Sequence, residues 1–136
     1  METIRAFIAI ELPSQVQKKL GEVINRLKRA PVESVRWVQP HNIHITLKFL
    51  GDVPINQIPI LTQVLKDETL RHKPFEISIG GLGAFPNLRK PRVIWVGVEA
   101  PPGLARLQAG IETETRRILG TIVKRIAGSV LSKFCA

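Results

Sequence analysis

The 136-residue sequence has a single cysteine and no long apolar run, and each shortage excludes a class of protein. One thiol, Cys135, cannot form an internal disulfide, which excludes a disulfide-stapled secreted fold. No stretch approaches the ~18 apolar residues of a membrane-spanning helix, and Glu2 and Arg5 do not fit a signal peptide. We therefore expect a soluble, cytoplasmic protein with no membrane partner, and an exposed terminal thiol at Cys135.

The sequence is also poor in acidic residues and has no dense basic run. Twenty Lys and Arg against eleven Asp and Glu leave a formal charge of +9, which favours polyanionic partners such as RNA. Without a Lys/Arg-rich run there is no dedicated binding arm, and basicity alone also fits nonspecific nucleic-acid binding. At this length, with 44% hydrophobic residues, the chain fits one folded domain.

Residues 42–49 combine a strand pattern with reactive side chains. The alternating apolar positions, expected to face the core, are Ile43, Ile45, Leu47 and Phe49. Residues two apart on a strand point the same way, so His44, Thr46 and Lys48 share one row. A proton-transferring imidazole, a hydroxyl donor and an ammonium suit a phosphate ester. The same pattern also describes an ordinary solvated sheet face, so the residues alone leave both interpretations open.

The remaining pattern predicts a mixed chain of strands and helices. The expected elements are a central strand over 3–12, a helix from residue 14, the strand over 42–49 (the motif strand), a helix over 57–70, strands over 75–79 and 92–99, and a helix from about residue 102. Ser14 with Gln17 fits a capping box, and the glycines at 80–83 predict a tight loop or bulge. His41 is expected in a turn and His72 at the surface.

An internal repeat relates the two halves of the chain. Shifting residues 7–13 by 88 positions places them on 95–101, so that strand, glutamate, proline and amphipathic helix occur twice. The repeat predicts duplicated lobes and a second His-x-Thr strand near position 44 + 88 = 132. That position is Ser132, position 134 is Phe134, and no histidine follows His72. The second copy that the repeat predicts is therefore missing from the sequence.

These features resemble the two-histidine phosphoesterase superfamily, and specifically its RNA 2',3'-cyclic phosphodiesterase (2'-5' RNA ligase-like) branch. The resemblance covers residues 3–119 and is carried by His44-Ile45-Thr46-Leu47, the opening 5–13, the lead-in 36–38, the stretch 48–53, Phe85-Pro86 and 91–95. It implies an α+β, bilobal fold with antiparallel sheets and outer helices, here with an incomplete second lobe. We predict one domain over 1–136, with 120–136 as a divergent or truncated tail.

The resemblance also implies an activity and its residues. It implies hydrolysis of an RNA or nucleotide 2',3'-cyclic phosphate to a 2'-phosphomonoester, without a metal or other cofactor. His44 would be the proton donor to the leaving ribose oxygen, and Thr46 would bind the phosphate. Lys48 and Arg92 are further candidate phosphate contacts. The histidines His41, His44 and His72 have no convincing Cys, Asp or Glu partners at metal-ligand spacing.

The missing second motif keeps other interpretations open. The chain could be a catalytically impaired RNA-binding remnant, or a truncated or frame-shifted fragment that depends on a partner. Its tail over 115–136 has five basic and no acidic residues and could form a basic amphipathic helix that contacts RNA or a membrane surface. The cations at 89–92 could flank a phosphate chain or simply be solvated. Oligomeric state and RNA ligation stay open as well.

Overall fold

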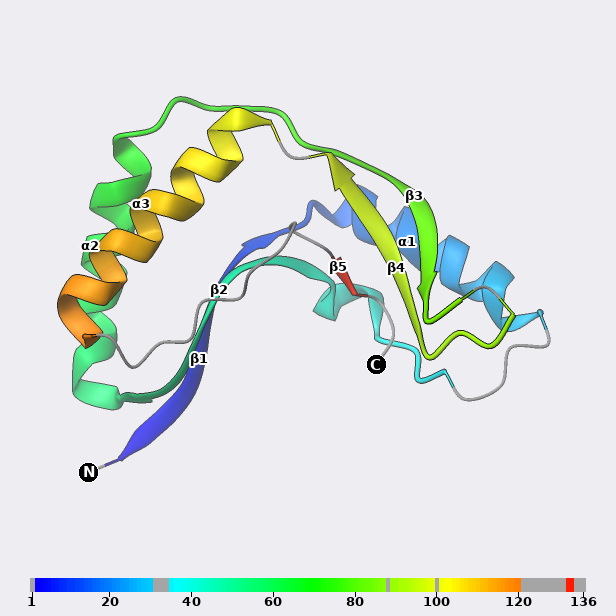
Figure 1. Cartoon of the computed structure of the whole chain (residues 1–136), viewed down its shortest axis with the longest axis horizontal. Coiled ribbons are helices and arrows are strands. Elements are labelled where there is room, and N and C mark those ends of the chain that lie inside the picture. Colours follow the sequence, from blue (N-terminus) through cyan, green and yellow to red (C-terminus); the bar gives the residue numbers. More distant parts are fainter. Residues whose placement is uncertain (1, 31–34, 88, 100, 121–131, 134–136) are drawn as a thin grey trace. The chain divides into compact units, whose positions relative to one another are not determined.

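The computed structural model describes residues 2–30, 35–87, 89–99, 101–120 and 132–133 (Figure 1). Its elements are β1 (Thr3–Glu11), α1 (Ser14–Lys28), η1 (Pro40–Asn42), β2 (His44–Pro54), η2 (Ile55–Gln57), α2 (Ile58–Leu70), β3 (Ser78–Phe85), β4 (Val93–Glu99), α3 (Pro102–Leu119) and β5 (Ser132–Lys133). The fold is therefore α+β, as predicted. Of the basic tail helix predicted within 115–136, residues 115–119 form the end of α3 and Ser132–Lys133 form β5 instead. The remainder past residue 120, with the thiol of Cys135, lies outside the described residues.

The described chain divides into two compact units. The first is formed by the described residues within 1–9, 46–77 and 100–129, and the second by those within 10–45, 78–99 and 130–136. Strands β1 and β2 pair in a two-stranded sheet, and each contributes residues to both units. No helix in the described ranges is long and apolar enough to cross a membrane.

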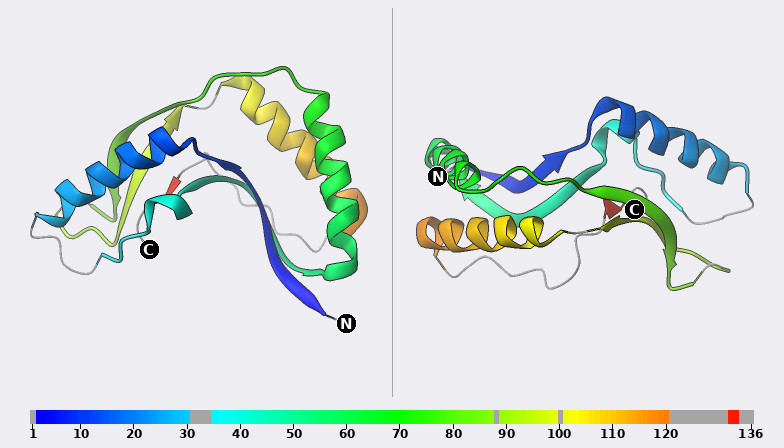
Figure 2. Two further views of the ribbon diagram at one scale, coloured as in Figure 1. Left: turned by 180° about the vertical axis from the view of Figure 1, so that it is seen from behind. Right: turned by 90° about the horizontal axis from the view of Figure 1, so that it is seen from above.

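Helices α2 and α3 lie side by side in the first unit (Figures 1 and 2). Pro59 occupies the first turn of α2, where its missing N–H costs nothing. The helical spacing of the apolar residues correctly predicted both helices. Their buried apolar side chains are Leu61 of α2 and Leu104, Leu107 and Ile111 of α3. These four residues supply much of the core of this unit.

A buried carboxylate, Glu68, joins α2 to α3. It is 6% exposed, its Oε1 lies 2.9 Å from His72 Nε2, and Arg71 Nη1 donates to its Oε2 over 3.0 Å. Arg71 also lies 3.7 Å from Glu114 of α3. A Cβ at Gly110 of α3 would stand only 1.9 Å from Glu68 Oε1, so the bare backbone there makes room for the carboxylate. His72 lies in the turn after α2, as predicted, but its side chain is only 18% exposed and pairs with Glu68.

Helix α1 covers part of the second unit through Leu20 and Ile24, which are buried. The predicted capping box is wrong. Pro13 is the N-cap residue, Ser14 is already helical, and no side chain caps the helix. The proline fixes an extended φ at the cap, so the chain enters the helix without the side-chain bond that the Ser14 pattern indicated.

The second unit also contains the antiparallel sheet β3-β4-β5. The strand predicted over 75–79 begins only at Ser78, because pairing with β4 starts at the partners Ser78 and Glu99. The register shifts between Gly80 and Leu82, and Gly81 adopts φ 75°, so the predicted bulge is confirmed.

The repeat seen in the sequence recurs in the element boundaries. β1 ends at Glu11 and β4 at Glu99, while α1 begins at Ser14 and α3 at Pro102, each pair 88 positions apart. β2 begins at His44, and β5 begins 88 positions later and pairs with β4. The strand equivalent to the motif strand is therefore present without the motif residues.

Strand β1 is not the central strand that its apolar run predicted. In the part of the chain that the structure describes, β1 pairs with β2 alone. Ile4 and Phe7 are each 50% exposed. The apolar run therefore does not reflect burial on both faces, and part of it forms an open apolar surface.

Candidate active site

A short turn sets the start of the motif strand β2. Pro40 opens the 3₁₀ turn η1, where Asn42 N donates to Gln39 O over 2.8 Å and Ile43 N donates to Pro40 O over 3.1 Å. His41 lies in this turn with its side chain exposed, as predicted. Because the chain leaves the turn at Ile43 in an extended conformation, the next residue, His44, is the first of the strand.

The first part of β2 has the alternation that the sequence predicts. Ile43 and Ile45 are each 1% exposed, whereas His44 and Thr46 are half-buried. The buried isoleucines hold the backbone on either side of His44, so the imidazole and the Thr46 hydroxyl share the opposite strand face. An imidazole for proton transfer and a hydroxyl for hydrogen bonding are thus carried on a rigid element.

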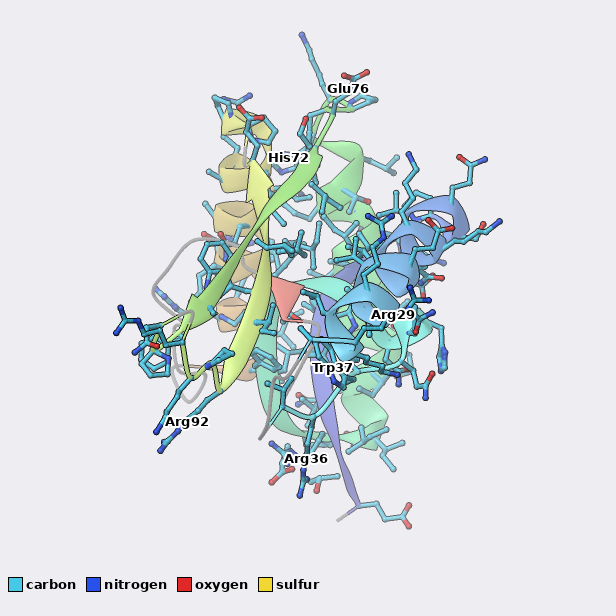
Figure 3. The ribbon with its side chains drawn as sticks, turned by 90° about the vertical axis from the view of Figure 1, so that its right-hand side faces the viewer. Arg29, Arg36, Trp37, His72, Glu76 and Arg92 are labelled. Carbon is cyan, nitrogen blue, oxygen red and sulfur yellow. The ribbon has the colours of Figure 1, made fainter. Side chains whose placement is uncertain are left out.

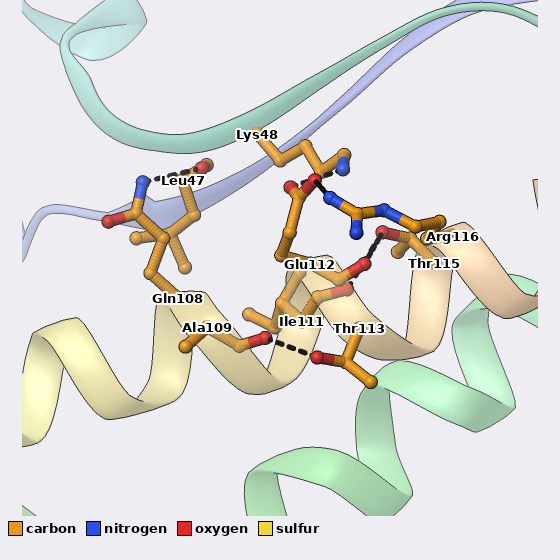
Figure 4. A network of polar contacts seen from close by, with 9 residues as sticks. All are labelled: Leu47, Lys48, Gln108, Ala109, Ile111, Glu112, Thr113, Thr115 and Arg116. Carbon is orange, nitrogen blue, oxygen red and sulfur yellow. Dashed lines mark hydrogen bonds and ion pairs between the residues drawn. The ribbon is translucent and has the colours of Figure 1, made fainter. Parts of the chain in front are cut away.

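Lys48 was a candidate phosphate contact because it continues the polar face of His44 and Thr46, but its partner in the structure is a carboxylate. Its side chain is only 5% exposed, and its ammonium forms an ion pair with the Glu112 carboxylate of α3 (Figure 4). The alternation fails here because α3 covers this part of the strand. We therefore treat Lys48 as a residue that ties β2 to α3, and we do not retain it as a phosphate ligand.

Further polar contacts surround this ion pair (Figure 4). Arg116 Nη2 donates to Glu112 Oε1 over 2.9 Å, and Gln108 Nε2 donates to the Leu47 carbonyl over 3.1 Å. The Lys48 ammonium beside Glu112 lowers the pKa of that carboxyl, and Arg116 adds to the effect, against the opposing effect of burial. The strand that carries His44 and Thr46 is thereby bonded to α3 through a side chain and a backbone carbonyl.

The lowered pKa of Glu112 predicts an acid-sensitive contribution to stability. A carboxyl whose folded pKa lies below its ordinary value of 4.5 stabilises the fold fully above that value, and the contribution is lost as the pH falls through the folded pKa. The free energy of unfolding, measured by urea titration from pH 7 to pH 3, should therefore fall more steeply for the wild type than for Glu112→Gln. Parallel curves for the two proteins would contradict the prediction.

Phe49 was predicted to face the core, and this prediction is wrong. Its side chain is 50% exposed and lies against Phe7 of β1, with ring centroids 6.2 Å apart and planes tilted by 48°. Two half-exposed rings form an apolar surface of the kind on which unpaired nucleobases stack. The strand pattern alone gave no sign of this pair, because the exposed face depends on which side the helices cover.

Arg92, the other candidate phosphate contact, lies just before β4. Its backbone N donates to the Phe85 carbonyl over 2.8 Å, which closes the β3–β4 connection. Its side chain is exposed and points away from the strands at the end of the hairpin (Figure 3). Arg92 belongs to the second unit, as does His44.

The described residues contain no group of three or more His, Cys, Asp or Glu side chains that could hold a metal ion. The sequence interpretation missed Glu112 and Glu68, the two carboxylates that organise the first unit. A signal for Glu112 exists in its i,i+4 spacing to Arg116, but that spacing is common on exposed helices.

The described fold and the His44–Thr46 strand can be set beside known proteins. The family model described as LigT like Phosphoesterase matches residues 10–95. The RNA 2',3'-cyclic phosphodiesterase of Methanothermobacter thermautotrophicus is 40% identical over 111 residues, which are 82% of this chain and 60% of that protein. The enzyme of the same name from Archaeoglobus fulgidus is 34% identical over 115 residues, 85% of this chain and 63% of that protein.

Solved structures agree with the sequence relatives. The crystal structure of TT0787 of Thermus thermophilus superimposes with a TM-score of 0.77 at 29% identity, covering 97% of this chain and 73% of that one. Escherichia coli LigT complexed with 3'-AMP gives 0.75 at 27% identity, covering 98% and 72%. The fold is thus that of a phosphoesterase with antiparallel sheets and helices. The chain belongs to the LigT-like phosphoesterase family, and it spans about three fifths of the length of these curated relatives.

Proposed function

We propose that this chain hydrolyses RNA 2',3'-cyclic phosphates to 2'-phosphomonoesters, with His44 as the proton donor and Thr46 as a phosphate ligand. The observation that carries the proposal is the His44-x-Thr46 pair on one face of β2, in a chain whose relatives are named RNA 2',3'-cyclic phosphodiesterases.

In the proposed reaction, a water oxygen forms a bond to phosphorus while the bond from phosphorus to the ribose O3' breaks. The leaving O3' receives a proton from the His44 imidazolium, and the Thr46 hydroxyl donates a hydrogen bond to a non-bridging oxygen. Arg92 is retained as a candidate contact to the phosphate charge. The attacking water loses its proton to solvent, because positions 132 and 134 do not carry the second His-x-Thr motif whose histidine is the base in the family pattern.

The test is hydrolysis of 2',3'-cyclic AMP by the purified chain, with phosphate NMR to identify the 2'-phosphate product. General acid catalysis is worth on the order of 10²–10⁴ in rate, so His44→Ala should lower turnover at least about a hundredfold. His41→Ala is the matched control, since His41 is an exposed imidazole three positions away and should leave turnover unchanged. Equal losses in both variants, or no loss in His44→Ala, would refute the assigned role.

A second candidate function is RNA binding without turnover. The observation that favours it is the absence of His and Thr at positions 132 and 134, where the repeat expects them. It predicts that the wild-type chain shows no cyclic phosphate hydrolysis but binds RNA in a manner that weakens steeply with salt. The hydrolysis assay above separates the two candidates, because only the first predicts a 2'-phosphate product.

A further inference from the structure

The tip of the β3–β4 hairpin gathers cations and an aromatic ring, of which only Arg92 has a place in the proposed chemistry. Segment 85–92 contains Arg89, Lys90 and Arg92 and no acidic residue. Arg89 and Lys90 are exposed, and among the described residues no carboxylate forms an ion pair with either of them. Phe85, at the end of β3, is 67% exposed. We call Phe85, Arg89 and Lys90 the hairpin cluster.

The backbone that carries the hairpin cluster is held by specific hydrogen bonds. Asn87 Oδ1 accepts from the backbone N of Arg89 over 2.9 Å and from that of Lys90 over 3.0 Å. The bond from Arg92 N to the Phe85 carbonyl closes the same connection. A side-chain acceptor that engages two successive N–H groups fixes the local turn, so the two cations are presented from a defined backbone.

The chemistry of the hairpin cluster fits single-stranded RNA. Nonspecific single-strand sites combine cations that follow the phosphate backbone with aromatic rings on which successive bases stack. Arg89 and Lys90 supply the first property and Phe85 supplies the second. Among the described residues, no carboxylate neutralises the two cations, and the phenylalanine ring stays largely exposed. The packing of this unit therefore gives no structural reason for the hairpin cluster.

We infer that the hairpin cluster is a binding site for single-stranded RNA, contacting nucleotides beyond the terminal one that is hydrolysed. The inference rests on the proposed function only in taking RNA as the ligand. It gives the chain a preference for oligonucleotides over mononucleotides, with Arg89 and Lys90 on phosphates and Phe85 on an unpaired base.

The experiment measures binding of a fluorescein-labelled RNA of roughly ten nucleotides with a 3'-hydroxyl end, a length within the range of single-strand sites. Such an RNA carries no cyclic phosphate, so binding is read without turnover. Fluorescence anisotropy between 50 mM and 300 mM salt would compare the wild type, Arg89→Gln/Lys90→Gln and Phe85→Leu. The charge control is Lys18→Gln/Lys19→Gln, which removes two exposed cations from α1 in the same unit.

Each phosphate contact on a single strand contributes about 0.7 to the slope of log affinity against log salt. The Arg89/Lys90 double variant should therefore lower this slope by about 1.4 and weaken binding on the order of tenfold near 0.1 M salt. Phe85→Leu should weaken binding roughly fivefold or more without changing the salt slope, because a lost base stack carries no counterion release. The Lys18/Lys19 control should retain most of the affinity.

Equal losses in the Arg89/Lys90 and Lys18/Lys19 variants would overturn the inference, since they would show only a general effect of net charge. So would an unchanged affinity in Phe85→Leu, or equal dependence on Phe85 for duplex RNA of the same sequence, whose bases are not open for stacking. If 2',3'-cyclic AMP is not hydrolysed but RNA binding depends on the hairpin cluster, the proposed function fails and this inference stands.

Discussion

Replacing Glu112 with alanine is expected to lower the free energy of unfolding by about 3–5 kcal/mol, the usual cost of removing one partner of a buried ion pair. The large effect follows from burial of the other partner, because the Lys48 side chain is only 5% exposed and loses its counterion. A typical domain is stable by roughly 5–15 kcal/mol, so this loss would leave the chain close to unfolding. Chemical denaturation at pH 7 measures it directly.

Variants of the partner residue test whether the loss is due to an unpaired buried charge. Lys48→Met should cost less than Glu112→Ala, because Glu112 keeps Arg116 and is 19% exposed. In Lys48→Met/Glu112→Ala the cost should fall well short of the sum of the single changes, a coupling that defines an interacting pair. As a control, Arg117→Ala removes a pair in which Arg117 is 72% exposed, so it should cost less than about 1 kcal/mol. A Glu112→Ala cost as small as this control would contradict burial of the pair.

Gly83→Ala is expected to destabilise the second unit by about 1–3 kcal/mol, the range for an added methyl group in a closely packed place. Gly83 lies opposite Trp95 in the β3–β4 register, and a Cβ at Gly83 would stand 1.9 Å from Cζ2 of the indole. The added methyl group would displace the Trp95 indole, which packs directly on the Gly83 backbone. Thermal unfolding would measure the loss, and a shifted tryptophan emission would report the moved ring.

A glycine in the same strand provides the control for this change. Among the described residues beyond its chain neighbours, no heavy atom lies within 4 Å of the place that a Cβ at Gly80 would take. Gly80→Ala should therefore change stability by no more than about 0.5 kcal/mol. Both changes remove a glycine from β3, so only the contact with Trp95 distinguishes them. If both variants are equally stable and the emission is unshifted, the indole does not rest on Gly83.

The features that the sequence predicted well are those set by residues close together in the chain. The alternation from Ile43 to Leu47, the two long helices with their buried leucines, and the bulge at Gly81 all depend on residues near one another in the chain. The strand over 92–99 and the helix after it were likewise predicted from local pattern, and the 88-residue repeat recurs in their boundaries.

The prediction failed where a distant segment decides the outcome. Lys48 continues the polar alternation, yet it is buried because α3 covers it, and there it pairs with Glu112, 64 positions later. Phe49 continues the apolar alternation, yet it is half exposed. The strand predicted at 75–79 has the right pattern, but its pairing begins at Ser78. In each case the side chain's environment is set by tertiary contacts that no pattern within a short window contains.

The contact between Glu68 and Gly110 has a consequence for how α2 and α3 find each other during folding. Two helices can shift by one turn along each other and still pack their apolar faces, because leucine side chains of the same shape recur one turn apart. A slide of one turn along α3 would bring Arg106 or Glu114 to the place of Gly110, and either side chain would collide with the Glu68 carboxylate. The missing side chain at Gly110 thus leaves space for the carboxylate at one alignment of the helices only. Misaligned pairs, which the core leucines alone would permit, are destabilised by this clash.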